Sequence, residues 1–134
     1  MSVLKPLKLK PQVVSEAKEQ EWLFRWRQWA MRQYPELRWL HAIPNGLAAS
    51  SIGAAARMKR QGMTKGIPDI CLPVARRGCH GLYIELKRSN GGKASPEQAA
   101  CIQFLNEQGY RAEICHGWRA AVEVIEWYLR EPTR

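Results

Sequence analysis

Apolar residues follow two different spacings along the chain, and each spacing predicts one kind of secondary structure. Four segments repeat apolar residues every three or four positions, which is typical of amphipathic helices: residues 15–34, 48–61, 95–108 and 118–129. Four shorter segments are continuously apolar or alternate, which is typical of strands: residues 37–43, 69–74, 82–86 and 110–115. The order α-β-α-β-β-α-β-α predicts an α/β domain whose mixed sheet carries helices on both faces.

Capping residues mark the ends of these predicted helices. Ser15 is a good N-cap for the first helix, and Pro35 should stop it. Ser95, Pro96 and Gln98 form the sequence of a capping box with proline in the first turn. Residues 1–14 have three lysines and two prolines without either spacing, so we expect a flexible basic arm before a single domain at 15–134.

The charge of the chain is unevenly distributed. The net charge is +9, with 17 Lys and Arg against 6 acids in residues 1–94 and 4 against 6 in the remainder. A basic surface of this kind favours a polyanionic partner, above all nucleic acid, although a basic solvated surface is the simpler alternative. No apolar run approaches the roughly 20 residues that span a bilayer, and the cysteines form no CxxC pair. We expect a soluble, intracellular protein with reduced cysteines, no membrane contact and no organic cofactor.

The residues with the clearest chemical potential lie in two of the predicted strands. Asp69, the one aspartate of the chain, follows Pro68 at the start of a strand. On the next strand, Glu85 and Lys87 share a face because side chains alternate. Two carboxylates can bind Mg²⁺, and the lysine can orient or activate a water or neutralise charge on a phosphate. The alternative is an exposed Glu85–Lys87 ion pair on an edge strand.

The pattern Gly66-Ile67-Pro68-Asp69 followed by Ile84-Glu85-Leu86-Lys87 resembles the PD-(D/E)XK nuclease superfamily. More narrowly, the chain resembles the VRR-NUC family over about residues 16–129. The further motifs that carry this resemblance are Pro44-Asn45-Gly46, the basic helix before Gly62, Lys65-Gly66 and Ser95-Pro96-Glu97-Gln98.

The resemblance has several implications. It implies a restriction-endonuclease-like fold and hydrolysis of DNA with Mg²⁺ or Mn²⁺, often on branched DNA such as Holliday junctions. It also implies a homodimer, since short members of the family cut two strands with two sites related by a two-fold axis. Asp69 and Glu85 would bind the metal, the Leu86 carbonyl would add a ligand, and Lys87 would assist the attacking water.

Two further positions come from the same resemblance. The family places a glutamate of the first helix near the metal, and Glu19 is the better candidate because it extends the apolar stripe, with Glu16 second. Both glutamates could instead favour the helix N-terminus electrostatically. Gln98 matches the S-P-x-Q motif and would lie near the catalytic site, although a capping box explains it equally well.

Basic residues are the candidates for contacts with DNA phosphates, and a solvated helix end is the alternative for several of them. The candidates are Arg57, Lys59, Arg60, Lys65 and Arg88. Asn45 either faces the substrate or simply forms a turn. Most tryptophans are expected in the core, and Trp39 is the one that could stack on a base. Those expected in the core because they lie on apolar stripes are Trp22, Trp26, Trp29 and Trp118. The rival functions are a DNA-binding module without catalysis and an RNA nuclease with the same site.

Overall fold

The computed structural model describes residues 13–44 and 50–130. This part of the chain has four α-helices, one 3-10 helix and four strands. In chain order they are α1 (Glu16–Ala30), η1 (Pro35–Trp39), β1 (His41–Ala42), α2 (Ile52–Arg60), β2 (Ile70–Leu72), β3 (Leu82–Lys87), α3 (Pro96–Glu107), β4 (Arg111–His116) and α4 (Trp118–Leu129). Of the predicted basic arm, only residues 13 and 14 fall within the described part.

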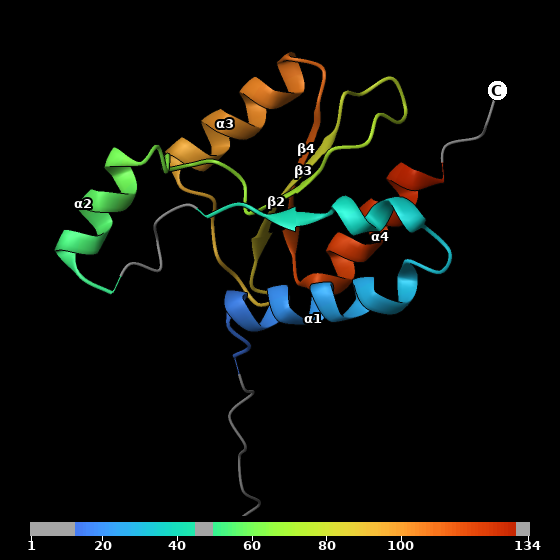
Figure 1. The fold of residues 1–134 in the computed structure, drawn as a ribbon, viewed down its shortest axis with the longest axis horizontal. Helices are drawn as coiled ribbons and strands as arrows, with labels where there is room; N and C mark the ends of the chain where they lie inside the picture. The colour runs from blue at the N-terminus through green and yellow to red at the C-terminus, as the bar shows by residue number, and fades with distance from the viewer. Residues whose placement is uncertain (1–12, 45–49, 131–134) are drawn as a thin grey trace, which may run out of the picture.

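The strands form one mixed sheet in the order β1-β2-β3-β4. β2 runs antiparallel to both β1 and β3, and β4 runs parallel to β3, as the α3 crossover between them requires. Helices α1 and α4 pack side by side against one face of the sheet, and α3 packs against the other (Figure 1). The predicted mixed sheet with helices on both faces is therefore confirmed.

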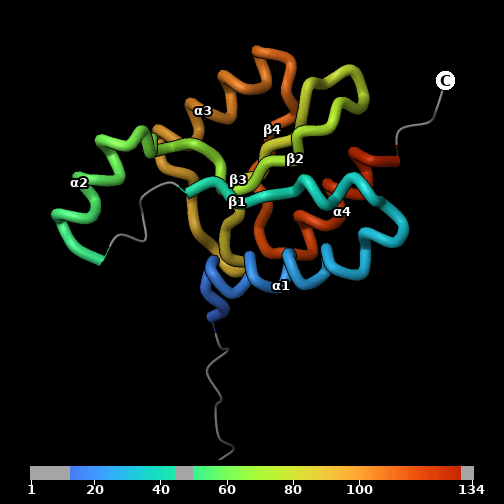
Figure 2. Tube along the Cα trace, viewed as in Figure 1, coloured from blue at the N-terminus to red at the C-terminus, as the bar shows by residue number. Residues whose placement is uncertain are grey.

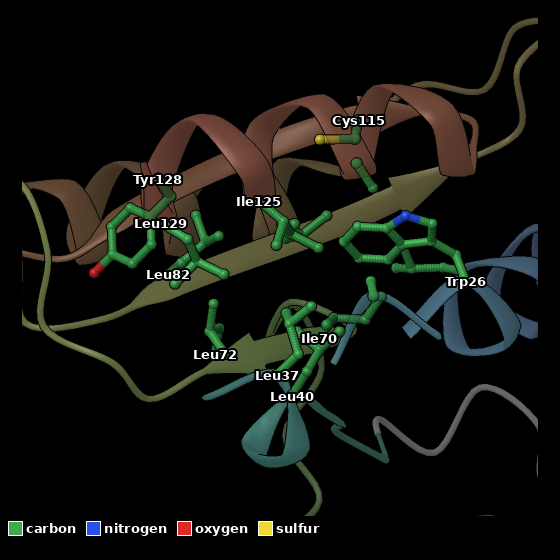
Figure 3. Packing of buried hydrophobic residues seen from close by; sticks show 14 of the residues in the cluster. Trp26, Leu37, Leu40, Ile70, Leu72, Leu82, Cys115, Ile125, Tyr128 and Leu129 are labelled. Atoms are coloured by element: carbon green, nitrogen blue, oxygen red, sulfur yellow. The ribbon is translucent and has the colours of Figure 1, made fainter. Parts of the chain in front are cut away.

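The hydrophobic core lies between the sheet and the α1–α4 pair (Figure 3). Leu23 and Trp26 of α1 meet Ile84 of β3 and Ile125 of α4, and all four side chains are at most 5% exposed. Because alternate residues of β3 point to opposite faces, burying Ile84 in this core directs Glu85 toward α3. The packing of the core thus determines which face carries the polar residues of β3.

The starts of α1 and α3 agree with the sequence, and the end of α1 does not. Ser15 Oγ accepts a hydrogen bond from the Lys18 amide, and the capping box of Ser95 and Gln98 is complete. Helix α1 ends at Ala30, four residues before the predicted stop. The chain then turns tightly, and Tyr34 is buried beside Ala30 in the core cluster. The helix therefore ends before Tyr34, the residue whose backbone Pro35 restricts to an extended conformation.

The predicted strand at residues 37–43 is mostly wrong. Residues 35–39 form the 3-10 helix η1, and the strand that follows is two residues long. Pro35 presets the backbone angle of a helical first turn. Leu37 and Leu40 are both buried, and their separation of three residues suits a 3-10 turn, whereas an extended strand would place them on opposite faces. The apolar run alone could not separate these two structures.

Helix α2 stands apart from the rest of the fold (Figures 1 and 2). It was predicted from residue 48 and begins at Ile52, with Ser51 Oγ accepting a hydrogen bond from the Ala54 amide. None of its residues is buried, and Ile52 is 92% exposed. Among the described residues, no helix has the length and apolar character needed to cross a membrane.

Candidate active site

The pairing of β2 with β3 brings Asp69 next to Glu85. Ile70 pairs with Ile84 in this antiparallel register, so the preceding residue, Asp69, lies opposite Glu85. The Leu86 amide donates a hydrogen bond of 2.9 Å to Asp69 Oδ2, which attaches this carboxylate to the backbone of β3. The two carboxylates that are 16 positions apart in the sequence therefore meet at one end of β2.

Glu85, Lys87 and Gln98 form a buried network on the α3 side of the sheet. Lys87 Nζ lies 3.5 Å from Glu85 Oε1 and donates a hydrogen bond of 2.9 Å to Gln98 Oε1. Gln98 Nε2 in turn donates to Glu85 Oε1 at 2.8 Å. The three residues are 1%, 7% and 7% exposed and β3 is an interior strand, so the alternative of an exposed ion pair on an edge strand is wrong.

The alternatives for Gln98 turn out to be compatible. Its Oε1 accepts hydrogen bonds from the Ser95 amide at 2.8 Å and from Lys87 Nζ at 2.9 Å. One carbonyl oxygen has two lone pairs, so a single side chain completes the capping box and also contacts the site. The N-terminus of α3 is thereby coupled to the polar face of β3.

The pKa of Glu85 is unusually high for a glutamate side chain. Burial and then the neighbouring charge of Asp69 raise the pKa of Glu85 to about 7, while Lys87 acts in the opposite direction. Its Oε2 atom is buried and accepts no hydrogen bond from the described residues. A carboxylate that is desolvated, crowded by another carboxylate and short of one donor is well suited to a cation.

The residues present fit a hard divalent metal ion. Asp69 and Glu85 offer carboxylate oxygens, and Leu86, whose amide bonds Asp69, offers a carbonyl from the backbone between Glu85 and Lys87. Oxygen donors of this kind are what Mg²⁺ and Mn²⁺ take, with water completing the shell. The described residues hold no cluster of three or more His, Cys, Asp or Glu side chains around this point.

Glu19 lies elsewhere, at the start of α4. It is 3% exposed, and its Oε2 accepts a hydrogen bond of 2.7 Å from the Trp118 amide. The N-cap position of α4 is Gly117, which has no side chain, so Glu19 serves as the cap from another helix. The structure does not bring Glu19 together with Asp69 and Glu85. Glu19, which was predicted to bind the metal, is instead hydrogen-bonded to the backbone of α4.

Gly92 shows that Glu16 lies on the lysine side of the site. A Cβ atom added at Gly92 would be 3.7 Å from Lys87 Cβ and 3.9 Å from Glu16 Oε1. The loop after β3 therefore packs along the stem of Lys87, a role that the sequence analysis missed. The signal was present in the Gly91-Gly92 pair, where both residues have positive φ angles of 83° and 87°.

Gly66 allows the segment before Asp69 to pack closely against the start of α3. It has a φ of +96°, and a Cβ there would lie 2.9 Å from the Glu97 carbonyl carbon, which no real contact tolerates. Lys65 forms an ion pair of 3.5 Å with Glu97 at the same junction. The motifs around Gly66 and Ser95 are thus in contact, and this contact sets Asp69 and Gln98 relative to each other.

The candidates for DNA contact are dispersed. Arg57, Lys59 and Arg60 form the exposed last turn of α2. Arg88 is half-buried after β3, and its carbonyl oxygen lies 3.2 Å from His116 Nδ1. Lys65 is exposed although it is paired with Glu97, and Asn45 lies outside the described residues.

A mixed sheet that brings an aspartate at a strand start to a Glu-x-Lys strand is the arrangement of a PD-(D/E)XK-type nuclease. The family model of the VRR-NUC domain matches residues 14–119. The chain belongs to the VRR-NUC family, and a nuclease-type function in DNA processing follows from that membership.

A solved structure supports the same assignment. It is a VRR-NUC domain protein with 29% sequence identity and a TM-score of 0.73, and the match covers 89% of this chain and 91% of that one. No curated protein matches the chain. The similarity over nearly both full lengths confirms the fold as well as the family.

Proposed function

We propose that this protein is an endonuclease that hydrolyses DNA phosphodiesters with Mg²⁺, for which Mn²⁺ can substitute. The observation that carries the proposal is the meeting of the half-buried Asp69 with the buried Glu85, beside the buried Lys87. Keeping a buried carboxylate next to a second carboxylate opposes folding unless a cation or proton compensates the charge. A module that merely binds DNA through a basic surface gains nothing from such a pair, so catalysis is the better explanation.

Each side chain has a definite task in this proposal. Asp69, Glu85 and the Leu86 carbonyl hold the metal, which supplies Lewis-acid activation of the phosphate and lowers the pKa of an attacking water when bound. Lys87 has three N–H donors, and two of them face Glu85 and Gln98. The third is available to orient the water or to offset charge that develops on the phosphate.

Gln98 has a positioning task. Its amide fixes both the Glu85 carboxylate and the Lys87 ammonium, and α3 fixes the amide through the Ser95 backbone. Rigid placement of this kind lets the two charged groups meet the substrate without first rearranging. The fold thus supplies orientation for a reaction in which the protein performs no covalent step.

The substrate in this proposal is branched DNA, such as a Holliday junction, and the enzyme acts as a homodimer. Paired cuts across a symmetric junction need two sites related by a two-fold axis. The exposed basic turn of α2 and Arg88 are the proposed phosphate contacts. Because these contacts release counterions, we expect binding to weaken steeply with added salt.

The test is a cleavage panel of duplex, single-stranded, flap, fork and four-way-junction DNA, each with Mg²⁺, Mn²⁺, Ca²⁺ or EDTA. The proposal expects cleavage of branched DNA in Mg²⁺ and Mn²⁺ and none in EDTA. It expects binding without turnover in Ca²⁺, whose looser shell positions water poorly. Matched RNA branches form a second arm. Faster cleavage of RNA would make the protein an RNA nuclease, and no cleavage with any metal would favour the binding module.

A further inference from the structure

An aromatic groove lies between α1 and the start of α4. One cavity of about 330 Å³ is lined by Trp22, Arg25, Trp26, Trp29, Trp118 and Arg119. A second cavity of about 300 Å³ shares Trp22, Trp118 and Arg119 with the first. We call the two together the tryptophan groove. Each has the size of a pocket that takes a small organic group such as a nucleobase.

Core packing does not account for all of the tryptophans that line the groove. Trp22, Arg25, Trp26 and Trp29 recur every three or four residues on one side of α1. Trp26 is 5% exposed and belongs to the core, whereas Trp29 is 62% exposed. The exposed Trp29 leaves an open aromatic face on the surface, and such faces are typical of binding sites.

The groove leads toward the candidate active site. Its second cavity is also lined by Ser89, His116 and Gly117. Ser89 is two residues beyond Lys87, and the Gly117 amide donates a hydrogen bond of 2.8 Å to the Lys87 carbonyl. His116 pairs with Lys87 in the register of β3 and β4. A strand of nucleic acid leaving the site around this end of the sheet would enter the groove.

The charges of the groove suit a polyanion. Arg25 and Arg119 are exposed, and neither forms an ion pair with another described residue. The Arg119 guanidinium lies 5.6 Å from the ring centre of Trp118. The one acid in the lining, Glu19, is buried and already bonded to the Trp118 amide. Cations beside open aromatic rings are the usual means of binding single-stranded nucleic acid.

A second copy of the chain is a poorer occupant. A two-fold interface centred on the groove would bring Arg25 and Arg119 of one copy toward the same cations of the other, without exposed acids in the lining to offset them. We infer that the tryptophan groove binds the unpaired strand of a branched DNA substrate. Bases stack on Trp22, Trp29 and Trp118, and phosphates contact Arg25 and Arg119. The inference rests on the proposed function for the source of that strand.

The test measures binding of a fluorescent ten-nucleotide oligo(dT) to the full chain by anisotropy in EDTA, where cleavage plays no part. Trp29→Ala should weaken binding by about 5-fold or more, because stacking contributes on the order of 1–3 kcal/mol per base. Arg25→Ala should reduce the slope of log Kd against log salt by about 0.7, the effect of one phosphate contact on a single strand. Phe104→Ala is the control, since Phe104 is also an exposed aromatic residue, 57% exposed, and lies outside the groove.

Each outcome decides the inference. Equal affinities of wild type and Trp29→Ala, or an equal loss in Phe104→Ala, would overturn it. If Trp29→Ala converts a dimer into a monomer in sedimentation while oligo(dT) affinity is unchanged, the groove is a dimer interface and the inference is wrong. The groove variants could lose oligo(dT) affinity as expected while the wild type cuts no substrate in Mg²⁺. That result would support strand binding by the tryptophan groove and would refute the proposed nuclease function.

Discussion

Replacing Gln98 with alanine should disturb both the stability of the fold and the geometry of the site. Three hydrogen bonds of 2.8, 2.9 and 2.8 Å join this side chain to Ser95, Lys87 and Glu85. Two of them involve buried charged groups and contribute about 1.5–3 kcal/mol each, and the capping bond adds about 1 kcal/mol. Glu85 and Lys87 still pair with each other in the variant, so the net loss should be about 2–4 kcal/mol.

The assay is thermal unfolding followed by circular dichroism. A loss of 2–4 kcal/mol corresponds to a fall in Tm of about 10 °C for a domain of this size. Two variants of α3 serve as controls. Ser95→Ala removes the hydroxyl cap and leaves both site contacts of Gln98, so it should cost about 1 kcal/mol. Gln103→Ala removes an exposed glutamine and should cost less than about 0.5 kcal/mol.

The same variants should separate in cleavage assays. Gln98→Ala should lower the cleavage rate strongly, because neither Glu85 nor Lys87 keeps its orienting partner. Ser95→Ala should retain most of the activity once it is assayed well below its Tm. If Gln98→Ala melted within a degree or two of Gln103→Ala and cut DNA at the wild-type rate, the coupling of α3 to the site would be refuted.

Glu19→Gln should lower the Tm by several degrees, because the amide lacks the charge that stabilises the start of α4. Glu16→Gln is the control and should leave the Tm unchanged. Equal melting points of the two variants in calorimetry would contradict the capping role. The pKa of Glu85, about 7, lies above its ordinary value of 4.5, so folding favours its protonated form. The contribution of Glu85 to the unfolding free energy is therefore greatest below pH 4.5, where the side chain is protonated in both states. This contribution is lost as the pH rises through 7, because the buried carboxyl must then ionise. The unfolding free energy of the metal-free wild type should therefore fall relative to Glu85→Gln between pH 5 and 8, and Mg²⁺ should restore it; a constant difference would refute the assignment. Gly66→Ala should destabilise the protein more than Gly62→Ala, since both glycines have positive φ but only a Cβ at Gly66 meets Glu97; equal urea midpoints would argue against the close packing on α3.

Much of the site could be predicted because it depends on local rules. Alternation along one strand places Glu85 and Lys87 on one face whatever the tertiary structure. The Ser95–Gln98 capping box likewise depends on only four consecutive residues. Asp69 was a candidate because it follows Pro68 at the start of the neighbouring strand, and the resemblance to a family supported its partnership with Glu85. The contact itself depends on how β2 pairs with β3, which no local rule determines.

The errors arose where tertiary packing decides the outcome. The stripe of α1 correctly predicted that Glu19 faces inward, but the sequence could not show that the start of α4 would be its partner. The apolar run at 37–43 fits a strand and a 3-10 turn equally well, and the burial of Leu37 and Leu40 selects the turn. Trp29 was expected in the core with Trp26 and is exposed, because the stripe is wider than the surface it covers.

The central claim is that Asp69, Glu85 and Lys87 form a metal-dependent cleavage centre. The most direct measurement is the single-turnover cleavage rate of a four-way DNA junction in Mg²⁺, with enzyme saturating the DNA, for wild type, Asp69→Ala, Glu85→Ala and Lys87→Ala. Each variant should lose activity by orders of magnitude and keep nearly wild-type DNA affinity and a folded circular dichroism spectrum. Near-normal cleavage by any folded variant would contradict its place in the centre, and near-normal cleavage by all three would contradict the claim itself.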